Sequence, residues 1–159
     1  GSTFDFAGPH HPVAASPGLP KPLQSPLPVI VGGGGPSRTP RLAARFAAEY
    51  NAPFMSRDLF REQCDRVRAA CDAIGRDPAT LAHSATQFVC VCADEAEFTR
   101  RAAAIGREPD ELRENGVAGV ADEAAATIAR WADAGADRLH LQVLDLDDLD
   151  HLDLLATLV

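Results

Sequence analysis

The sequence predicts a parallel α/β fold, and three observations support this. Segments with the pattern of a β-strand alternate with segments of helical pattern four times along the chain, and no short hairpin turn joins two successive strands. Such alternation calls for parallel strands joined by right-handed crossovers, as in a doubly wound sheet or a βα barrel. A complete eight-unit barrel takes about 250 residues, so this chain of 159 residues has room for half of one.

The N-terminal segment, residues 1–26, differs from the rest of the chain. It holds six of the twelve prolines and no periodic stretch longer than a few residues. Proline removes a backbone donor and interrupts regular structure. We therefore expect an extended arm here, with one short strand near residues 3–6, followed by a second region, 27–159, that contains the α/β fold.

The α/β region begins with a strand, a glycine run and a helix. Val29–Val31 is a short apolar strand, followed by four consecutive glycines and the sequence Pro-Ser-Arg-Thr-Pro. Thr39 suits the N-cap position and Pro40 the first helical position, so we expect a helix over 40–48. The sequence Tyr-Asn-Ala-Pro-Phe at 50–54 is a second strand candidate.

The rest of the chain continues the same alternation. Apolar residues recur at helical spacing after Ser56, and Asp94 with Glu97 forms the capping pair of a later helix. In order, the pattern predicts a helix at 57–74, a strand at 83–92, helices at 95–105, 109–116 and 122–134, a strand at 137–144, and an amphipathic helix from 149.

The four cysteines occur as two pairs. Cys64 and Cys71 are seven residues apart on one face of a predicted helix, and Cys90 and Cys92 share one face of a predicted strand. Neither pair has the Cys-x-x-Cys spacing of a zinc ribbon. We therefore expect four buried, reduced thiols and no metal site.

The composition argues against several classes of partner. The formal net charge is −8 and aromatic residues make up 6% of the chain, which argues against nucleic-acid binding. No apolar run approaches the roughly 20 residues needed to cross a bilayer, and the N-terminal residues lack the order of a secretory signal. These features predict a cytoplasmic protein that binds neither nucleic acid nor membrane.

The glycine run has the parts of a phosphate site. The loop after a parallel strand leads into a helix N-terminus, where free amides and the helix dipole favour an anion. Glycine lets the backbone approach a phosphate closely, and Ser37 and Thr39 add hydroxyl groups. The loop has neither the Lys-Ser/Thr ending of a Walker motif nor a Gly-x-Gly-x-x-Gly fingerprint. A flexible turn before a capped helix is the alternative interpretation.

Three stretches, residues 19–51, 73–81 and 116–159, carry a family resemblance through their order and spacing. They resemble the C-terminal half of the luciferase-like monooxygenase family, in particular its coenzyme F-420-dependent oxidoreductases. Residues 3–13 are similar to the segment that leads into the family's Pro-Lys-Pro arm. The resemblance implies the C-terminal half, about four βα units, of a TIM (βα) barrel. Such enzymes bind F-420 or FMN at the carboxyl ends of the strands and transfer hydride.

The resemblance also implies site residues and ligands. Coenzyme F-420, with FMN as the alternative, is the implied cofactor, together with a small-molecule substrate. Ala48 stands where the family usually has an aspartate, so any contact from that carboxylate is absent. Catalytic residues would lie in the strands that this chain lacks. Carried over by position, the phosphate loop falls on Gly33, Gly34, Gly35, Pro36, Ser37 and Thr39, and Gln142 is a further cofactor-binding candidate.

The last predicted strand contains two polar residues of interest. Period two places His140 and Gln142 on the face opposite Leu139 and Leu141, so one of these two sets points into the barrel. Asn51 is a weaker candidate for lining the site. The three histidines at 83, 140 and 151 have no carboxylate at fixed spacing, and we expect structural roles for them.

The resemblance thus implies a flavin- or deazaflavin-dependent oxidoreductase of which this chain supplies the phosphate-binding half. The family's first four strands have no counterpart here, so either the barrel is truncated or a second chain completes it. A half-barrel would leave strand edges and an apolar inner face uncovered. We therefore expect a homo-oligomer, or a complex with the missing N-terminal half, and no turnover by this chain alone. The alternatives are a non-catalytic half-barrel that homo-oligomerises and binds a phosphorylated ligand weakly or not at all, and a doubly wound binding domain.

Overall fold

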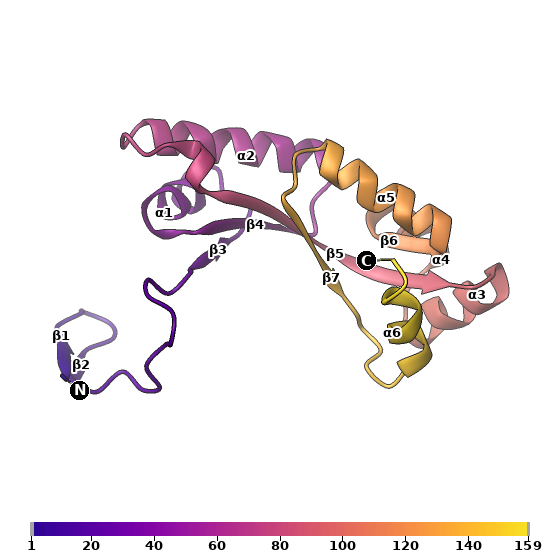
Figure 1. The fold of residues 1–159 in the computed structure, drawn as a ribbon, viewed down its shortest axis with the longest axis horizontal. Helices are drawn as coiled ribbons and strands as arrows, with labels where there is room; N and C mark the ends of the chain where they lie inside the picture. The colour runs from indigo at the N-terminus through magenta and orange to yellow at the C-terminus, as the bar shows by residue number, and fades with distance from the viewer. Residues whose placement is uncertain (1, 159) are drawn as a thin grey trace.

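The computed structural model describes residues 2–158, and its central feature is a twisted parallel sheet (Figure 1). Four strands alternate with helices as predicted: β3 (Ile30–Gly32), β4 (Glu49–Pro53), β5 (Ala82–Cys92) and β7 (Arg138–Gln142). β4 lies between β3 and β5, and β7 pairs with β5, with every one of these pairings parallel. The predicted parallel α/β fold is confirmed.

Strand β5 is longer than its neighbours and has three partners. β4 pairs with its residues 82–86 and β7 with residues 84–88, so these two strands lie on opposite edges of β5. A further short strand, β6 (Val117–Val120), pairs with residues 89–92. β6 was not predicted from the sequence, because Val-Ala-Gly-Val does not alternate between apolar and polar residues and is followed directly by a helix.

β4 and β6 lie end to end along the same edge of β5. Phe54 N donates to Thr86 O, and a Cβ added at Gly116 would lie 3.0 Å from Phe88 O. Carbonyls two residues apart on a strand point to the same edge, so the segments before β6 and after β4 face one edge of β5. Within residues 2–158, no strand pairs with this edge of β5 at Gln87 and Phe88, between the end of β4 and the start of β6.

Most helices cover one face of the sheet. Figure 1 shows α2 and α5 lying along it. α3 and α4 instead pack on the other face of the second half of β5. Among residues 2–158, no helix combines the length and apolar character that crossing a bilayer requires. The helices are α1 (Arg38–Phe46), α2 (Arg57–Asp72), α3 (Glu95–Ala104), α4 (Pro109–Asn115), α5 (Ala121–Asp133) and α6 (Leu149–Leu155), with a 3₁₀ turn at Pro78–Thr80.

The core lies between the helix-covered face of the sheet and α1, α2 and α5. Tyr50 and Ala85 point from the strands into it, together with Phe60 of α2 and Trp131 of α5. The rings of Phe60 and Trp131 meet edge to face, with centroids 5.6 Å apart. This packing fixes α2 and α5 side by side over β4 and β5.

All four cysteines are free and buried, as predicted. Cys64 and Cys71 lie on the inner face of α2 and belong to the main core. Cys90 and Cys92 share one face of β5, where they pack against Phe98 of α3. Period two in the strand and two helical turns in α2 account for both placements.

Two of three predicted helix caps are confirmed. Ser56 Oγ accepts from Leu59 N at 3.3 Å, and Asp94 caps α3. The prediction that Thr39 caps the first helix is wrong, because α1 begins at Arg38 with Ser37 in the N-cap position. The N–H groups of the first helical turn have no partner within the helix, so a proline loses nothing there by lacking one. Proline is therefore tolerated at the third helical position as well as at the first.

The N-terminal segment contains a small antiparallel sheet of its own. β1 (Phe4–Phe6) falls where a short strand was predicted, and it pairs with β2 (Val13–Ser16), which was not predicted. Figure 1 shows this hairpin set apart from the parallel sheet, with an extended stretch leading to β3. The hairpin was missed because its strands lie among closely spaced prolines.

Candidate functional site

The glycine loop follows the carboxyl end of β3 and runs into α1. Gly33 has φ +132°, a backbone conformation that favours glycine. Tyr50 Oη donates to Gly33 O at 2.8 Å, and Gln63 Nε2 donates to Gly34 O at 3.0 Å. Burial raises the pKa of Tyr50 to about 12, so its hydroxyl stays protonated as a donor. Two side chains from β4 and α2 therefore hold the loop carbonyls toward the protein.

Gly33 N donates to Asn51 O at 3.2 Å, but the loop amides after Gly33 have no protein partner among residues 2–158. Ser37 makes no side-chain cap to α1, and its exposed position opens the helix N-terminus to solvent. A helix N-terminus with unpaired N–H groups attracts anions through hydrogen bonds and the helix dipole. Within the described residues 2–158, no hydrogen-bond acceptor is found for the amides of Gly34, Gly35, Ser37, Arg38 and Thr39.

The space around the loop is limited. The Thr39 hydroxyl lies within the curve of the loop, 3.3 Å from where a Cβ would stand on either Gly33 or Gly35. A Cβ at Gly34 would come 2.7 Å from Met55 Cε. Side chains on these glycines would therefore occupy the approach to the amides.

The structure brings the six predicted loop residues together but does not bring Gln142 to them. Gln142 is the exposed last residue of β7, opposite Phe88 of β5. Three strand spacings separate β7 from β3, or about 14 Å at the usual spacing. His140 and Gln142 lie on the open face of the sheet, whereas Leu139 and Leu141 pack beneath the helices.

A second polar cluster lies on the open face and centres on Glu49. The side chain of Glu49 is only 3% exposed and pairs with Arg138 and with His140 Nε2, the latter 2.9 Å from its Oε1. Burial raises the pKa of the Glu49 carboxyl, but hydrogen bonds with Ser84, His140 and Arg138 outweigh burial and leave the pKa below its ordinary value. Glu49 is therefore a buried, ionised carboxylate.

Neighbouring strands extend this polar face. Asn51 Nδ2 donates to Ser84 Oγ at 2.9 Å, and Thr86 Oγ1 donates to Asn51 Oδ1 at 3.1 Å. Asn51, a weaker candidate from sequence, thus lies on this face. The expectation of an apolar inner face is wrong, because β4, β5 and β7 all turn polar side chains toward it.

Glu49 and Arg138 were missed as site residues. They are 89 positions apart in sequence, so no local spacing links them. One signal was available: the period of two that relates Gln142 to His140 continues to Arg138. The same period relates Asn51 to Glu49.

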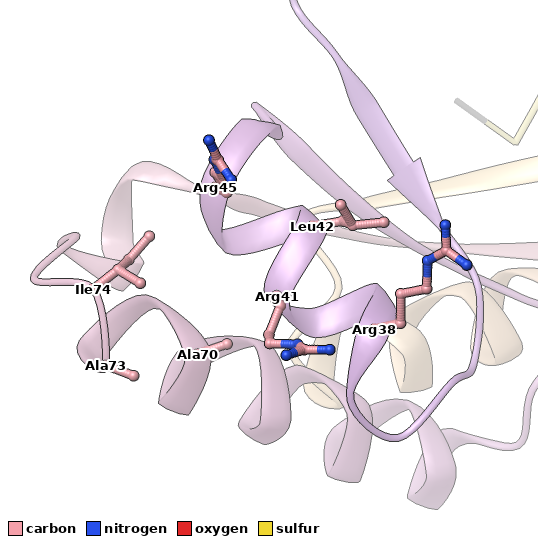
Figure 2. Close-up of a pocket in the computed structure, with 7 residues that line it drawn as sticks. All are labelled: Arg38, Arg41, Leu42, Arg45, Ala70, Ala73 and Ile74. Atoms are coloured by element: carbon pink, nitrogen blue, oxygen red, sulfur yellow. The ribbon is translucent and has the colours of Figure 1, made fainter. Parts of the chain in front are cut away.

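A cavity of about 520 Å³ lies between α1 and α2, away from the cluster around Glu49 (Figure 2). Four of its residues come from the outward face of α1, and Ala70, Ala73 and Ile74 come from the end of α2 and the turn after it. Figure 2 shows the side chains of Arg38 and Arg45 extending away from Ala70 and Ala73. The cavity reaches the start of α1 at Arg38, but its other lining residues lie along α1 and at the end of α2, and none belongs to a strand.

Comparison with family models decides the classification. The family model that describes luciferase-like monooxygenases matches residues 1–150 of this chain. This chain belongs to the luciferase-like monooxygenase family. The resemblance seen in the sequence is confirmed.

Solved structures of the family share the fold at low identity. An F-420-dependent secondary alcohol dehydrogenase, in complex with an F-420–acetone adduct, has 16% identity and a TM-score of 0.79, covering 99% of this chain and 55% of that one. EDTA monooxygenase from Chelativorans sp. BNC1 has 22% identity and a TM-score of 0.68, covering 99% and 49%. The oxygenating constituent of 3,6-diketocamphane monooxygenase from Pseudomonas putida, in complex with FMN, has 16% identity and a TM-score of 0.64, covering 94% and 54%.

These family structures are about twice as long as this chain. The chain spans about half the length of each, and it has the predicted fold of about half a βα barrel. Comparison with curated protein sequences gave no match.

Proposed function

We propose that this chain is the cofactor phosphate-binding half of an F-420- or FMN-dependent oxidoreductase. The observation that carries the proposal is the group of free amides at residues 34–39, at the carboxyl end of β3 and the N-terminus of α1. A phosphate there would accept hydrogen bonds from the backbone and interact favourably with the helix dipole. Both F-420 and FMN carry a phosphate that could occupy this position.

The proposed phosphate-binding residues are Gly33, Gly34, Gly35, Pro36, Ser37 and Thr39. The loop fits a phosphate because the carbonyls of Gly33 and Gly34 are held by Tyr50 and Gln63, while the amides after Gly33 have no acceptor within residues 2–158. Gln142 is the proposed contact for the ring system of the cofactor. The separation of about 14 Å across the strands suits a ligand with its phosphate at one end and its ring at the other.

When bound, the cofactor would carry out hydride transfer with a small-molecule substrate. Membership in the family supports an oxidoreductase, and the structural neighbours include proteins solved with F-420 and with FMN. F-420 is the preferred cofactor, because the sequence resembles the F-420-dependent members in particular.

We further propose that the half-barrel of residues 27–159 needs a partner over its open face, with residues 1–26 as a separate arm. The partner is the missing N-terminal half-barrel or a second copy of this chain. Closure would enclose the buried carboxylate of Glu49 and the exposed side chains of Arg138 and His140, which now face solvent. Activity then requires both halves, because catalytic groups in a barrel come from the ends of several strands.

The test is a fluorescence titration with FMN and with F-420. The chain is measured alone and mixed with a polypeptide that carries the first four βα units of a full-length family member. We expect the mixture to bind the cofactor and to reduce it when a hydride donor such as a secondary alcohol is added. We expect Gly34→Val to weaken binding at least about tenfold because the valine would displace Met55 and cover the amides.

Two threonines provide a matched pair of variants. Thr39→Val removes the hydroxyl inside the loop, whereas Thr99→Val removes one that donates to Glu95 O on the exposed face of α3. We expect only the first to weaken cofactor binding. Equal affinity for wild type and Gly34→Val would contradict the phosphate role. Cofactor reduction by this chain alone, with the same hydride donor added, would contradict the need for a second half.

A further inference from the structure

We propose that the gap between β4 and β6, on the edge of β5, binds a neutral single-ring phenol. The gap lies at the carboxyl end of β4, where ligands of parallel α/β folds gather. Its cavity has a volume of about 200 Å³. The cavity is lined by Phe54, Gln87, Phe88, Arg107, Glu111, Leu112, Asn115 and Gly116.

Two stacked aromatic rings form the apolar side of this cavity. Phe54 and Phe88 lie nearly parallel, with centroids 4.5 Å apart and planes at 22°, and the Arg107 guanidinium lies 4.8 Å from the centre of the Phe88 ring. Phe54 has φ +50°, a strained conformation for a bulky residue. Despite its apolar ring, Phe54 stays 48% exposed. A large aromatic ring held in a strained backbone and left half uncovered suits stacking against a further ring.

The polar groups in the cavity favour a neutral ligand that can hydrogen-bond. Arg107 Nη1 pairs with Glu111 Oε1 at 3.2 Å, so the two charges largely compensate each other. Gln87 is buried and its Nε2 donates to Met55 O at 2.8 Å, which leaves its Oε1 as an acceptor. A phenolic hydroxyl would donate to Gln87 Oε1 or Glu111 and accept from Arg107, whereas a carboxylate would lose its hydration without gaining a free positive charge, since Arg107 is already paired with Glu111.

The volume restricts the ligand to one ring. A protein cavity of about 150 Å³ holds a benzene molecule. The 200 Å³ available here therefore accommodates one six-membered ring with a small substituent, and not a tricyclic flavin or deazaflavin. The ligand of this subsite is thus distinct from the cofactor.

The role of this cavity as a substrate subsite rests on the proposed oxidoreductase function. The binding of phenol to the cavity does not depend on that function. The phosphate loop follows β3, whereas the gap follows β4 and is bounded by α4. The loop variant Thr39→Val, whose hydroxyl lies beside Gly33 and Gly35, should therefore leave phenol binding unchanged. The two proposals can fail separately.

The experiment is a chemical-shift titration of the isotope-labelled chain, without cofactor, with phenol, cyclohexanol and benzoate as probes. We expect saturable phenol binding with the largest shifts at Phe54, the Gln87 side-chain amide and Arg107. Cyclohexanol has a similar size and a hydroxyl but no aromatic ring, and we expect it to bind about fivefold more weakly. Benzoate tests the effect of Glu111 and should also bind more weakly than phenol.

Matched phenylalanine variants complete the design. Phe54→Leu keeps an apolar side chain without the ring, and Phe46→Leu makes the same change at a residue of α1 that is 55% exposed and lies beside Arg45. We expect the first to weaken phenol binding about fivefold and the second, like Thr39→Val in the glycine loop, to leave it unchanged. Equal binding of phenol and cyclohexanol, unaltered binding by Phe54→Leu, or no saturable phenol binding would each overturn the proposal.

Discussion

Glu49 Oε1 lies 2.9 Å from His140 Nε2, although the two residues belong to strands that are not neighbours. Both β4 and β7 pair with β5, and the two side chains meet across the open face of that strand. Arg138 makes an ion pair with the second carboxylate oxygen of Glu49. This pairing ties the middle of the sheet to its last strand.

The Glu49 pairing predicts a pH-dependent contribution to stability. We expect Glu49→Gln to lower the free energy of unfolding by about 1–3 kcal/mol near neutral pH, because hydrogen bonds to a charged group are lost. The pKa of Glu49 is below its ordinary value of 4.5 in the folded chain. Its contribution is therefore present above pH 4.5 and disappears as the pH falls through the folded-state pKa.

Urea unfolding of wild type and Glu49→Gln at several pH values checks this. Glu62→Gln is the control, since Glu62 pairs with Arg66 on the exposed surface of α2. The two variants should differ clearly from each other at pH 7 and converge in acid. A loss of the same size for both variants would contradict a special role for Glu49.

His151 should make the chain less stable in mild acid. Its side chain is buried, and its Nε2 accepts from Val91 N at 3.0 Å, which requires the neutral ring. Burial lowers the pKa of His151 below its ordinary value of 6.5. Below pH 6.5 the unfolded chain therefore binds a proton that the folded chain does not, and stability falls as the pH is lowered toward the folded-state pKa.

Variants at His151 separate its titration from its hydrogen bond. His151→Gln keeps an acceptor and should reduce the pH slope between about 6.5 and 5, while His151→Ala should cost about 1–3 kcal/mol by leaving Val91 N unpaired. Part of the slope should remain, because burial also lowers the pKa of His83. Thermal unfolding across this range, with His11→Gln as an exposed control, provides the measurement.

The buried pair of Arg101 and Asp148 predicts resistance to acid. Arg101 Nε donates to Asp148 Oδ2 at 2.8 Å, and hydrogen bonds from Arg101 lower the pKa of Asp148 to about 2. This contribution is present above the ordinary pKa of 3.8 and is lost as the pH falls toward 2. We expect Asp148→Asn to cost about 1–3 kcal/mol at neutral pH, measured by urea unfolding, since it removes one of the two carboxylates that pair with Arg101 and leaves Glu97 as the other. Asp150→Asn, on the exposed side of α6, should have little effect.

The four buried thiols should be unreactive in the native chain. Burial raises the pKa of all four, to about 12 for Cys64 and about 11 for Cys92, so the thiolate is scarce at neutral pH. A colorimetric thiol reagent should react slowly with the folded chain and at four positions after denaturation. Rapid reaction of any thiol under native conditions would show that the segment covering it opens readily.

The order of strands and helices could be predicted because local patterns determine it. The polar helix caps at Ser56 and Asp94, and the period of two through Cys90 and Cys92, each act within a few residues. The pairing of Glu49 with Arg138 could not be predicted, because it depends on which strands flank β5. The sequence shows four strands but contains no signal for the side of β5 on which β7 would lie.

The site was predicted unevenly for the same reason. The glycine loop is a continuous stretch, so all six of its residues were identified from sequence and lie together in the structure. The gap beside Phe54 depends on β6, a strand that no alternation revealed. Whether the loop binds phosphate is a prediction that the titrations described above will test.

The length of β5 separates the chain into parts that evolution can change independently. The last residues of β5 extend beyond its pairing with β4 and β7, and β6, α3 and α4 pack on this extension. No residue between 93 and 120 takes part in the pairing of β3, β4, β5 and β7, so changes in this segment that keep Arg101 beside Asp148 would leave their register intact. Related enzymes could diversify what they accept by exchanging this segment while keeping the same sheet.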